Sequence, residues 1–386
     1  MSAVPELRFP GFDGEWLARP LENLCSTVTS GSRDWAKYYS DAGSKFIRMT
    51  NLSRDNTRLL LDDLKYVALP SNSSEGSRTS LCSGDVLISI TAELGKIGLV
   101  PHDLGEAFIN QHTALVRPSP KDAVPAFLAQ CLATKKSNKR LNRLNDSGAK
   151  SGLNLSTVRS FEVRTPALPE QQKIAAFLGA VDNKIDALRR KHDALKQFKA
   201  GLMQKLFSQE LRFKREDGSD YPDWEEKRLG DVCDVDWGNT SLTKSAYVEG
   251  GQYIAVSATG CDGRIDMFEH QAGTPVLSAI GANCGKMFLP DEPFTAIKNT
   301  MVFTGATNSN FLYYSLCQHR FSIQGAGQPF IGKKDTEKST IRMPGQPEQQ
   351  KIADCLSAMD AKIEAVDHQI THIETFKAGL LQKMFV

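Results

Sequence analysis

Hydrophobic residues recur at a seven-residue spacing in two long segments of this chain, near residues 168–207 and 346–385. The main rows are Ile174, Val181, Leu188, Leu195 and Leu202 in the first segment, and Ile352, Met359, Val366, Ile373 and Leu380 in the second. A second row accompanies each: Leu178, Ile185 and Leu206, then Leu356, Ile363, Ile370 and Met384. A heptad sustained over four or five repeats predicts a coiled-coil helix. Each helix of about 38 residues would measure roughly 57 Å. Because each has an apolar stripe to bury, we expect the two to pair with each other.

These two segments are near-copies of one another. One opens LPEQQKIA at residues 168–175 and the other QPEQQKIA at residues 346–353; they close FKAGLMQKLF and FKAGLLQKMF. Pro169 and Pro347 suit a first helical turn, and Glu170 and Glu348 complement the positive end of the helix dipole. A span of about 40 residues that occurs twice indicates an internal duplication.

The stretches that precede the two copies resemble each other only faintly, although both begin with Leu-Arg-Phe (from Leu7 and from Leu211) followed by a tryptophan. Short apolar runs between Gly, Asn and Asp predict strands and turns. The predicted strands include residues 45–49, 84–89, 95–98, 252–256, 274–277 and 285–288, and one helix per body is expected at 125–144 and 310–321.

The predicted fold class is therefore α+β: two irregular β-rich bodies and two long helices in a pseudo-two-fold repeat. The expected boundaries are 1–166 for the first body, 167–208 for the first helix, 209–344 for the second body and 345–386 for the second helix.

The composition leads us to expect a soluble, cytoplasmic protein. The chain has 386 residues, a net charge of +2 and 40% hydrophobic residues. No apolar run approaches the roughly 18 residues of a membrane helix, and the N-terminus lacks the features of a signal peptide. The eight cysteines occur singly, without a CxxC pair, which disfavours a zinc site of that kind and predicts reduced, mostly buried thiols.

Motifs for catalysis are absent from the sequence. It has no HExxH, no GxSxG in a strand-turn-helix context, no EF-hand loop, and no Asn/Asp-Pro-Pro-Tyr/Phe motif for base methylation. Gly95-Lys96 and Gly285-Lys286 lack phosphate-loop spacing, so they predict glycine turns. We expect no catalytic residue, metal or cofactor on this chain, although an enzyme with an unrecognised site stays open as a weaker interpretation.

Three polar features allow two interpretations each. The cations Lys135, Lys136, Lys139, Arg140, Arg143 and Lys150 oppose only Asp146, and form either a solvated face or a phosphate-binding surface. His192 on the apolar seam is either a switch or ligand, or an edge residue whose polar end reaches water. Lys199 and Lys377 mark a place where the helices splay or meet a partner, or they extend to solvent.

Two further segments accompany the duplication, SGAKSGLN at 147–154 and GAGQPFI at 325–331. With the proline-flanked helix starts, they make the chain resemble, over essentially its whole length, the specificity subunit (HsdS) of type I restriction-modification systems. The family pattern is Leu-Pro-x-x-Glu-Gln; this chain has Gln346 where leucine is usual and a shortened Pro-Glu-Gln.

The resemblance implies two target-recognition domains separated by two antiparallel helices, with each domain reading one half of a split site in double-stranded DNA. The helices would set the spacing and dock two methyltransferase subunits (HsdM), and restriction subunits (HsdR) would join them. S-adenosylmethionine would be held by the methyltransferase. Half-sites about 34–36 Å apart would face the same side of the duplex.

Side chains that can reach bases or phosphates are Arg, Lys, Asn, Gln and Tyr in the polar loops. The candidates are Arg33, Lys37, Tyr38, Arg78 and Lys150 in the first body, and Asn239, Lys244, Lys286, Gln328, Lys333 and Lys334 in the second. The alternative function is a coiled-coil structural adaptor whose β bodies bind protein or glycan, which the modest net charge favours.

Overall fold

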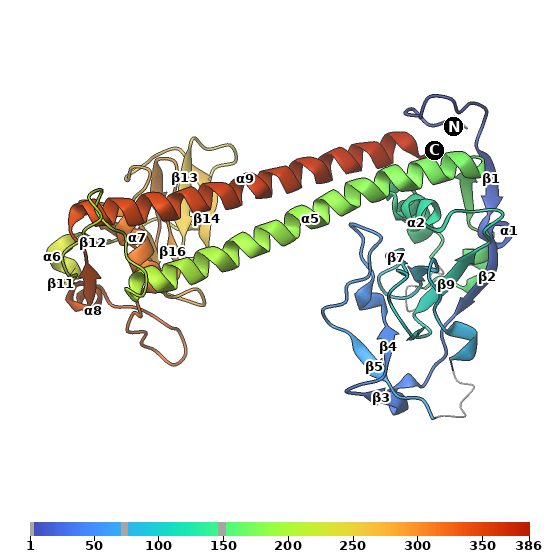
Figure 1. Cartoon of the computed structure of the whole chain (residues 1–386), viewed down its shortest axis with the longest axis horizontal. Coiled ribbons are helices and arrows are strands. Elements are labelled where there is room, and N and C mark those ends of the chain that lie inside the picture. Colours follow the sequence, from blue (N-terminus) through green and yellow to red (C-terminus); the bar gives the residue numbers. More distant parts are fainter. Residues whose placement is uncertain (1–3, 71–75, 146–151) are drawn as a thin grey trace. The chain divides into compact units, whose positions relative to one another are not determined.

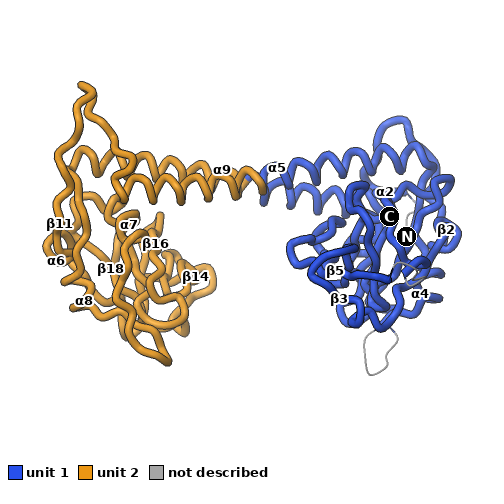
Figure 2. The backbone as a smooth tube through the Cα atoms, turned by 60° about the horizontal axis from the view of Figure 1, so that its bottom comes forward, with its two compact units in different colours: residues 1–188, 369–386 blue, residues 189–368 orange. Residues whose placement is uncertain are grey.

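The computed structural model of the chain describes residues 4–70, 76–145 and 152–386. The chain forms two compact units: unit 1 contains residues 1–188 and 369–386, and unit 2 contains residues 189–368 (Figure 2). Each unit holds one β-rich body and part of both long helices, α5 (Leu168–Phe207) and α9 (Gln346–Met384) (Figure 1). The predicted α+β class and its two long helices are confirmed.

The body of unit 1 has two four-stranded sheets. The first has the order β2-β9-β6-β7, and its strands are β2 (Cys25–Ser30), β9 (Thr113–Pro118), β6 (Val86–Ser89) and β7 (Ile97–Leu99). The second has the order β3-β5-β4-β8, from β3 (Tyr39–Ser40), β5 (Lys65–Val67), β4 (Ser44–Ile47) and β8 (Ala107–Ile109). In addition, β1 (Leu17–Pro20) pairs with β10 (Glu162–Thr165). The helices of this body are α1 (Leu21–Leu24), α2 (Pro125–Ala133), α3 (Lys135–Arg143) and α4 (Leu155–Ser160).

The body of unit 2 repeats this topology with one strand fewer in its second sheet. Its four-stranded sheet has the order β12-β18-β15-β16, from β12 (Asp234–Trp237), β18 (Thr300–Thr304), β15 (Val276–Ser278) and β16 (Met287–Phe288). A three-stranded sheet joins β14 (Gly260–Ile265), β13 (Tyr253–Ser257) and β17 (Phe294–Ala296), and β11 (Glu225–Arg228) pairs with β19 (Thr340–Met343). The helices are α6 (Leu229–Val232), α7 (Ser309–Gln318) and α8 (Lys333–Lys338). The parallel pair β4·β8 of unit 1 recurs as β13·β17, so the bodies share one fold despite their different sequences.

The core of each unit joins its body to the two helices. In unit 1, Phe127 of α2 packs against Phe385 with ring centroids 5.4 Å apart, and the same cluster contains Leu178 of α5 and Leu380 of α9. The start of one helix therefore lies beside the end of the other, which confirms the antiparallel pairing within this unit. In unit 2 the equivalent Phe311 packs 5.8 Å from Phe207, in a cluster with residues of both helices.

Lys199 and Lys377 form equivalent ion pairs between the helices. Lys377 Nζ lies 2.6 Å from Asp182 of α5, which also accepts a hydrogen bond from Gln130. In unit 2, Lys199 Nζ lies 2.5 Å from Asp360 of α9, which also accepts from a tyrosine hydroxyl on α7. Each lysine therefore has a specific partner on the other helix. His192, the other polar residue of the seam, has its Nδ1 3.4 Å from the carboxylate of the neighbouring Asp193.

A buried carboxylate opens each long helix. Glu170 is 2% exposed and accepts two hydrogen bonds of 2.7 Å from Arg8; Glu348 is fully buried and accepts from Arg212 at 2.9 and 3.2 Å. Hydrogen bonding to Glu170 raises the pKa of Arg8. These glutamates therefore do more than complement the helix dipole, because each ties the segment that precedes its body to the helix that follows it.

The contact between the end of a long helix and the Leu-Arg-Phe segment is made differently in the two units. In unit 2 the Leu211 N–H donates to the carbonyl of Lys205, only six residues earlier. In unit 1 the equivalent Leu7 N–H donates to the carbonyl of Lys383, which lies at the far end of the numbering. In unit 2 the chain therefore runs continuously from the end of the helix into the body. In unit 1 the equivalent junction is formed by two segments from opposite ends of the sequence.

Two expectations need correction. The single helix predicted at 125–144 is broken into α2 and α3 at Thr134, whose extended backbone (ψ 145°) and side-chain bond to the Ser137 N–H begin a new helix. The cysteines are all free, as expected, but only Cys131 and Cys233 are buried. The glycine turns are confirmed, since Gly95 and Gly285 have φ of +74° and +94°. Within the described ranges, no helix combines the length and apolarity needed to cross a membrane.

Candidate nucleic-acid interface

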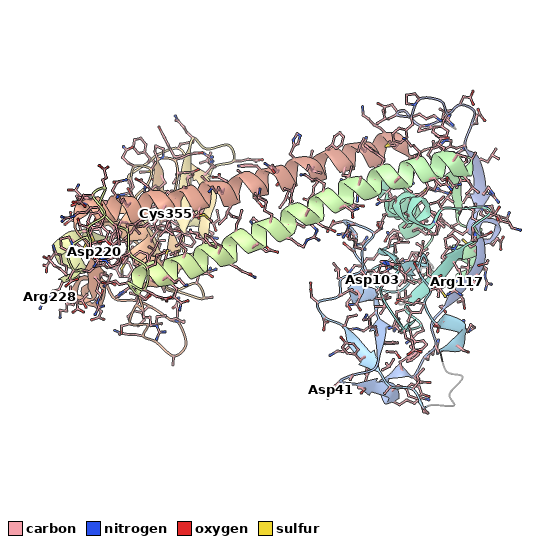
Figure 3. The ribbon with its side chains drawn as sticks, in the orientation of Figure 1. Asp41, Asp103, Arg117, Asp220, Arg228 and Cys355 are labelled. Atoms are coloured by element: carbon pink, nitrogen blue, oxygen red, sulfur yellow. The ribbon has the colours of Figure 1, made fainter. Side chains whose placement is uncertain are left out.

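Several cations of the bodies are committed to the fold. Arg117 of β9, labelled in Figure 3, donates 2.7 and 2.8 Å hydrogen bonds to the carboxylate of Asp85, which is 1% exposed. Hydrogen bonding to Asp85 raises the pKa of Arg117. Arg48 also forms an ion pair, with Asp63, but that carboxylate is exposed. Because the buried Asp85 carboxylate holds the Arg117 guanidinium in place, exposed loops are better candidates for contact with a nucleic acid.

One loop occupies the same place in both bodies. It leaves the four-stranded sheet at Gly31 after β2 and at Gly238 after β12, where each glycine N–H donates back to the adjacent strand. A Cβ at Gly31 would lie 2.1 Å from the carbonyl oxygen of Ile109, and one at Gly238 would lie 2.2 Å from the hydroxyl of Thr300. A side chain fits at neither position. Glycine therefore lets the loop leave the sheet along the same path in both bodies.

In unit 1 this loop carries three of the predicted residues. Arg33 precedes the short helix η1 (Trp35–Tyr38), which contains Lys37 and Tyr38. Trp35 is buried between Phe46 and Phe108 and anchors the loop, while the Arg33 and Lys37 side chains are exposed. Lys37 Nζ lies 4.8 Å from the ring centroid of Tyr38. The loop therefore presents two cations on a rigid base.

Arg78 joins this group from a distant segment. It lies on η3 (Ser77–Thr79), and its guanidinium donates to the hydroxyl of Thr29 and, at 3.0 Å, to the carbonyl of Ser30. Both acceptors end β2, immediately before the loop that carries Arg33. The structure thus brings four predicted residues of the first body together; the fifth, Lys150, lies outside the described residues.

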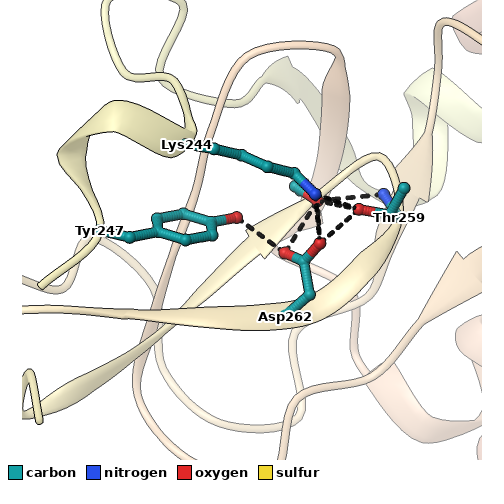
Figure 4. A network of polar contacts seen from close by, with 5 residues as sticks. Lys244, Tyr247, Thr259 and Asp262 are labelled. Atoms are coloured by element: carbon teal, nitrogen blue, oxygen red, sulfur yellow. Dashed lines mark hydrogen bonds and ion pairs between the residues drawn. The ribbon is translucent and has the colours of Figure 1, made fainter. Parts of the chain in front are cut away.

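In unit 2 the equivalent loop carries Asn239 and Lys244, and both are held by carboxylates. Asn239 Nδ2 donates to Glu269 at 2.6 Å. Lys244 Nζ lies 2.6 Å from Asp262, which also accepts from Tyr247 and Thr259 (Figure 4). Burial acts to raise the pKa of Asp262, but the hydrogen bonds from Lys244, Thr259 and Tyr247 outweigh it and hold that pKa well below its usual range. The lysine charge is therefore fixed in position and locally compensated.

Lys286 and Gln328 lie on neighbouring loops of unit 2. Lys286 follows the glycine turn between β15 and β16, and Gln328 lies on a loop joined to that region by a 2.9 Å hydrogen bond from the Gly281 N–H to the Pro329 carbonyl. Both side chains are exposed, and neither has an ion-pair or hydrogen-bond partner among the described residues. They are available to an external ligand.

Lys333 and Lys334 differ in their surroundings although both begin α8. Lys333 Nζ lies 2.7 Å from Asp236 of β12, and this hydrogen bond raises the lysine pKa. Lys334 is exposed. The first lysine holds α8 against the sheet, and only the second projects freely.

Two further segments carry exposed cations that are not among these candidates. On α3, the side chains of Lys135, Lys136, Lys139 and Arg143 are exposed while Leu141 is buried, an arrangement that fits both a solvated face and a phosphate-binding one. Sequence reasoning missed Lys298, which is exposed and whose N–H donates to the carbonyl of Leu242 in the Asn239–Lys244 loop. Nothing local in the sequence pointed to it, because the contact joins segments 56 residues apart.

The described residues contain no group of three or more His, Cys, Asp or Glu side chains arranged to hold a metal ion. Most of the candidate residues lie on loops that extend from the sheets of the two bodies.

The comparison with known families decides the assignment. The family described as "Type I restriction modification DNA specificity domain" matches residues 16–197 and again residues 221–375. The chain belongs to this family. It is a specificity subunit of a type I restriction-modification system, and the two matches follow its internal repeat.

Curated relatives agree with this assignment. The MjaIX specificity subunit of Methanocaldococcus jannaschii is 23% identical over 338 residues, covering 78% of this chain and 76% of the relative. The putative MjaX specificity subunit of the same organism is 23% identical over 397 residues, covering 95% and 92%.

Solved structures agree on the fold. The S subunit of the type I system from M. genitalium superposes with a TM-score of 0.67 at 15% identity, covering 99% of both chains. A chain from a study of complex assembly and conformational transition in the type I system gives a TM-score of 0.54 at 18% identity, also covering 99% of both.

Proposed function

We propose that this specificity subunit reads a double-stranded DNA site made of two unlike halves, one half for each body. The main support is the contrast between the shared strand order and the different recognition loops. The loop after Gly31 carries Arg33 and Lys37, whereas the loop after Gly238 carries Asn239 and Lys244. Because base identity is read by side chains in the grooves, different side chains on one scaffold select different sequences.

The two helices dock the methyltransferase subunits in this proposal. Phe198 and Phe376 occupy equivalent positions in the repeated FKAGL segments, and they are 61% and 52% exposed. Exposed aromatic side chains are enriched at protein interfaces. Two matching surfaces fit two copies of one partner, and restriction subunits join that assembly. The methyltransferase carries S-adenosylmethionine and the chemistry, while this chain supplies sequence choice and spacing without catalysis.

Exchange of residues 209–344 with those of another specificity subunit tests whether each body reads its own half of the DNA site. Expressed with the methyltransferase, the hybrid is expected to change one half of the methylated sequence, as read by methylome sequencing, and to keep the other half. The matched control exchanges residues 1–166 and changes the opposite half. A methylation pattern that is independent of this chain, or a contiguous palindromic site, contradicts the proposal.

The spacing role has a separate test. Matched insertions in α5 and α9 should alter the distance between half-sites and leave the bases read unchanged. If spacing stays constant, the helices do not determine it.

The alternative of a protein- or glycan-binding adaptor predicts no salt-dependent DNA binding. Phosphate contacts release counterions, so DNA affinity of the assembled complex should fall steeply as salt rises. A flat salt dependence would favour the adaptor.

A further inference from the structure

Unit 2 contains a polar cavity of about 440 Å³ beside the start of its long helix. Its wall includes Asp231 of α6, Asp234 at the start of β12, and Gln349 in the first turn of α9. Lys227 of β11 and the connection between β18 and α7 complete it. None of the predicted DNA-contacting residues lines this cavity.

The side chain of Gln349 has an unsatisfied hydrogen-bond acceptor, which indicates a ligand in this cavity. Its side chain is 7% exposed, and Nε2 donates to the carbonyl of Pro344 at 2.9 Å. Its Oε1 has no hydrogen-bond partner within the part of the chain that the structure describes. A buried acceptor without a donor costs free energy, and such atoms are rare in folded proteins. Gln349 also lines the cavity, so a ligand bound there would lie next to this residue.

Unit 1 shows how the same glutamine is satisfied elsewhere in this chain. The equivalent Gln171 also donates to a proline carbonyl, that of Pro166, at 2.9 Å, but its Oε1 accepts a 2.9 Å hydrogen bond from the N–H of Val124. Val124 ends the connection between β9 and α2, which spans residues 119–124. The corresponding connection in unit 2 spans only residues 305–308, so it is two residues shorter and delivers no such donor.

The longer connection of unit 1 also binds a guanidinium group. Arg19, the third residue of β1, donates to the Asp122 carboxylate at 2.8 Å and to the Asn23 carbonyl at 2.9 Å. The carbonyl of Asp122 in turn accepts from Gln171 at 3.3 Å. In unit 2 the third residue of β11 is Lys227, whose ammonium pairs with Glu225 at 3.0 Å. Asp231 and Asp234 have no ion-pair partner among the described residues.

We propose that this cavity binds a guanidinium group, carried either by a free ligand or by an arginine of a partner protein. A guanidinium presents five N–H donors in one plane, so it can donate to the Gln349 oxygen and to a carboxylate at the same time. Hydrogen bonds from a cation to Asp231 or Asp234 are of the stronger, charge-assisted kind. In unit 1 the guanidinium of Arg19 binds Asp122, the residue whose carbonyl accepts from the equivalent glutamine. This inference concerns a site apart from the recognition loops and does not depend on the proposed DNA reading.

Titration of the purified full chain with L-argininamide tests the proposal. The probe should shift the Gln349 side-chain amide signal in a saturable way, with the signal assigned from its loss in Gln349→Leu. The double variant Asp231→Asn/Asp234→Asn should bind at least about fivefold more weakly, as expected when charge-assisted bonds become neutral ones. The matched control, Gln171→Leu, removes the equivalent glutamine of unit 1 and should leave the affinity unchanged. No saturable shift, or equal affinity in the double variant, overturns the proposal.

An assay of assembly with the methyltransferase subunit distinguishes a free guanidinium ligand from an arginine of a partner protein. If a partner arginine occupies the cavity, argininamide should compete with assembly, and Gln349→Leu should weaken it at least threefold. If argininamide binds but assembly is unaffected by either change, the occupant is a free guanidinium compound.

Discussion

Replacement of Lys377 by methionine tests how burial controls the strength of the interhelical ion pairs. The side chains of Lys377 and Asp182 are 7% and 12% exposed, so the substitution leaves a largely buried carboxylate whose remaining hydrogen bond among the described residues is the one from Gln130. Removing one partner of a buried pair costs about 3–5 kcal/mol. Because Gln130 remains, we expect a loss near the lower end, about 3 kcal/mol.

The repeat supplies a matched control. Lys199→Met breaks the equivalent pair of unit 2, but Asp360 is 44% exposed and regains water once the lysine is gone. The expected loss is therefore about 1 kcal/mol, as for a partly exposed pair. Urea unfolding followed by circular dichroism gives the overall change, and amide hydrogen exchange near Asp182 and Asp360 assigns it to one unit.

A double variant separates the cost of the unpaired charge from the cost of altered packing. In Lys377→Met/Asp182→Asn the unpaired charge is removed, so about 2 kcal/mol of the loss should be recovered, measured as a double-mutant coupling energy. Equal losses in Lys377→Met and Lys199→Met, or strictly additive losses in the double variant, would refute the reasoning from burial.

Four other outcomes are expected. Gly31→Ala should destabilise unit 1 by at least about 2 kcal/mol because its Cβ meets the Ile109 carbonyl, whereas Gly179→Ala, with no atom within 4 Å, should be neutral or stabilising in thermal unfolding. Gln171→Leu should cost about 1 kcal/mol more than Gln349→Leu in urea unfolding, since only Gln171 accepts a hydrogen bond at Oε1. Because the folded pKa of Asp262 is lowered, its stabilisation is present above about pH 4 and is lost as the pH falls further; Asp262→Asn should therefore flatten the loss of unfolding free energy below about pH 4. Lys286→Ala should weaken DNA binding by the assembled complex about equally for all sequences and reduce the salt slope by about one unit, and an unchanged slope would exclude a phosphate contact.

The long helices could be predicted from the sequence because their heptads persist over many turns and their starts carry matched prolines. The strands could be located too, since Val86–Ser89 falls within a predicted run and Tyr253–Ser257 overlaps another in all but its last residue. The sheet order could not, because β2 pairs with β9 nearly ninety residues later, as in the register of Val28 with Val116. Pairing over such separations depends on tertiary packing that local patterns do not contain.

Residue type alone nominates candidates for the interface, but the sequence does not show which of them lie together. Arg33 and Lys37 are neighbours in sequence, but Arg78 reaches them only through its contacts with the end of β2. The partner of Lys199 lies 161 residues away, so the sequence left its role open. Lys333 illustrates the opposite case, since a suitable residue type at a suitable place is held by Asp236 instead.

The junction at Leu7 and Lys383 has a consequence for the order in which the molecule folds. Unit 2 is one uninterrupted stretch, residues 189–368, whereas unit 1 needs residues 369–386 to cover Trp16 and Phe127 with Phe385. A ribosome synthesises the chain from its N-terminus, and domains fold as their residues emerge. The first body therefore emerges first but waits, with part of its core uncovered, until the second has been made.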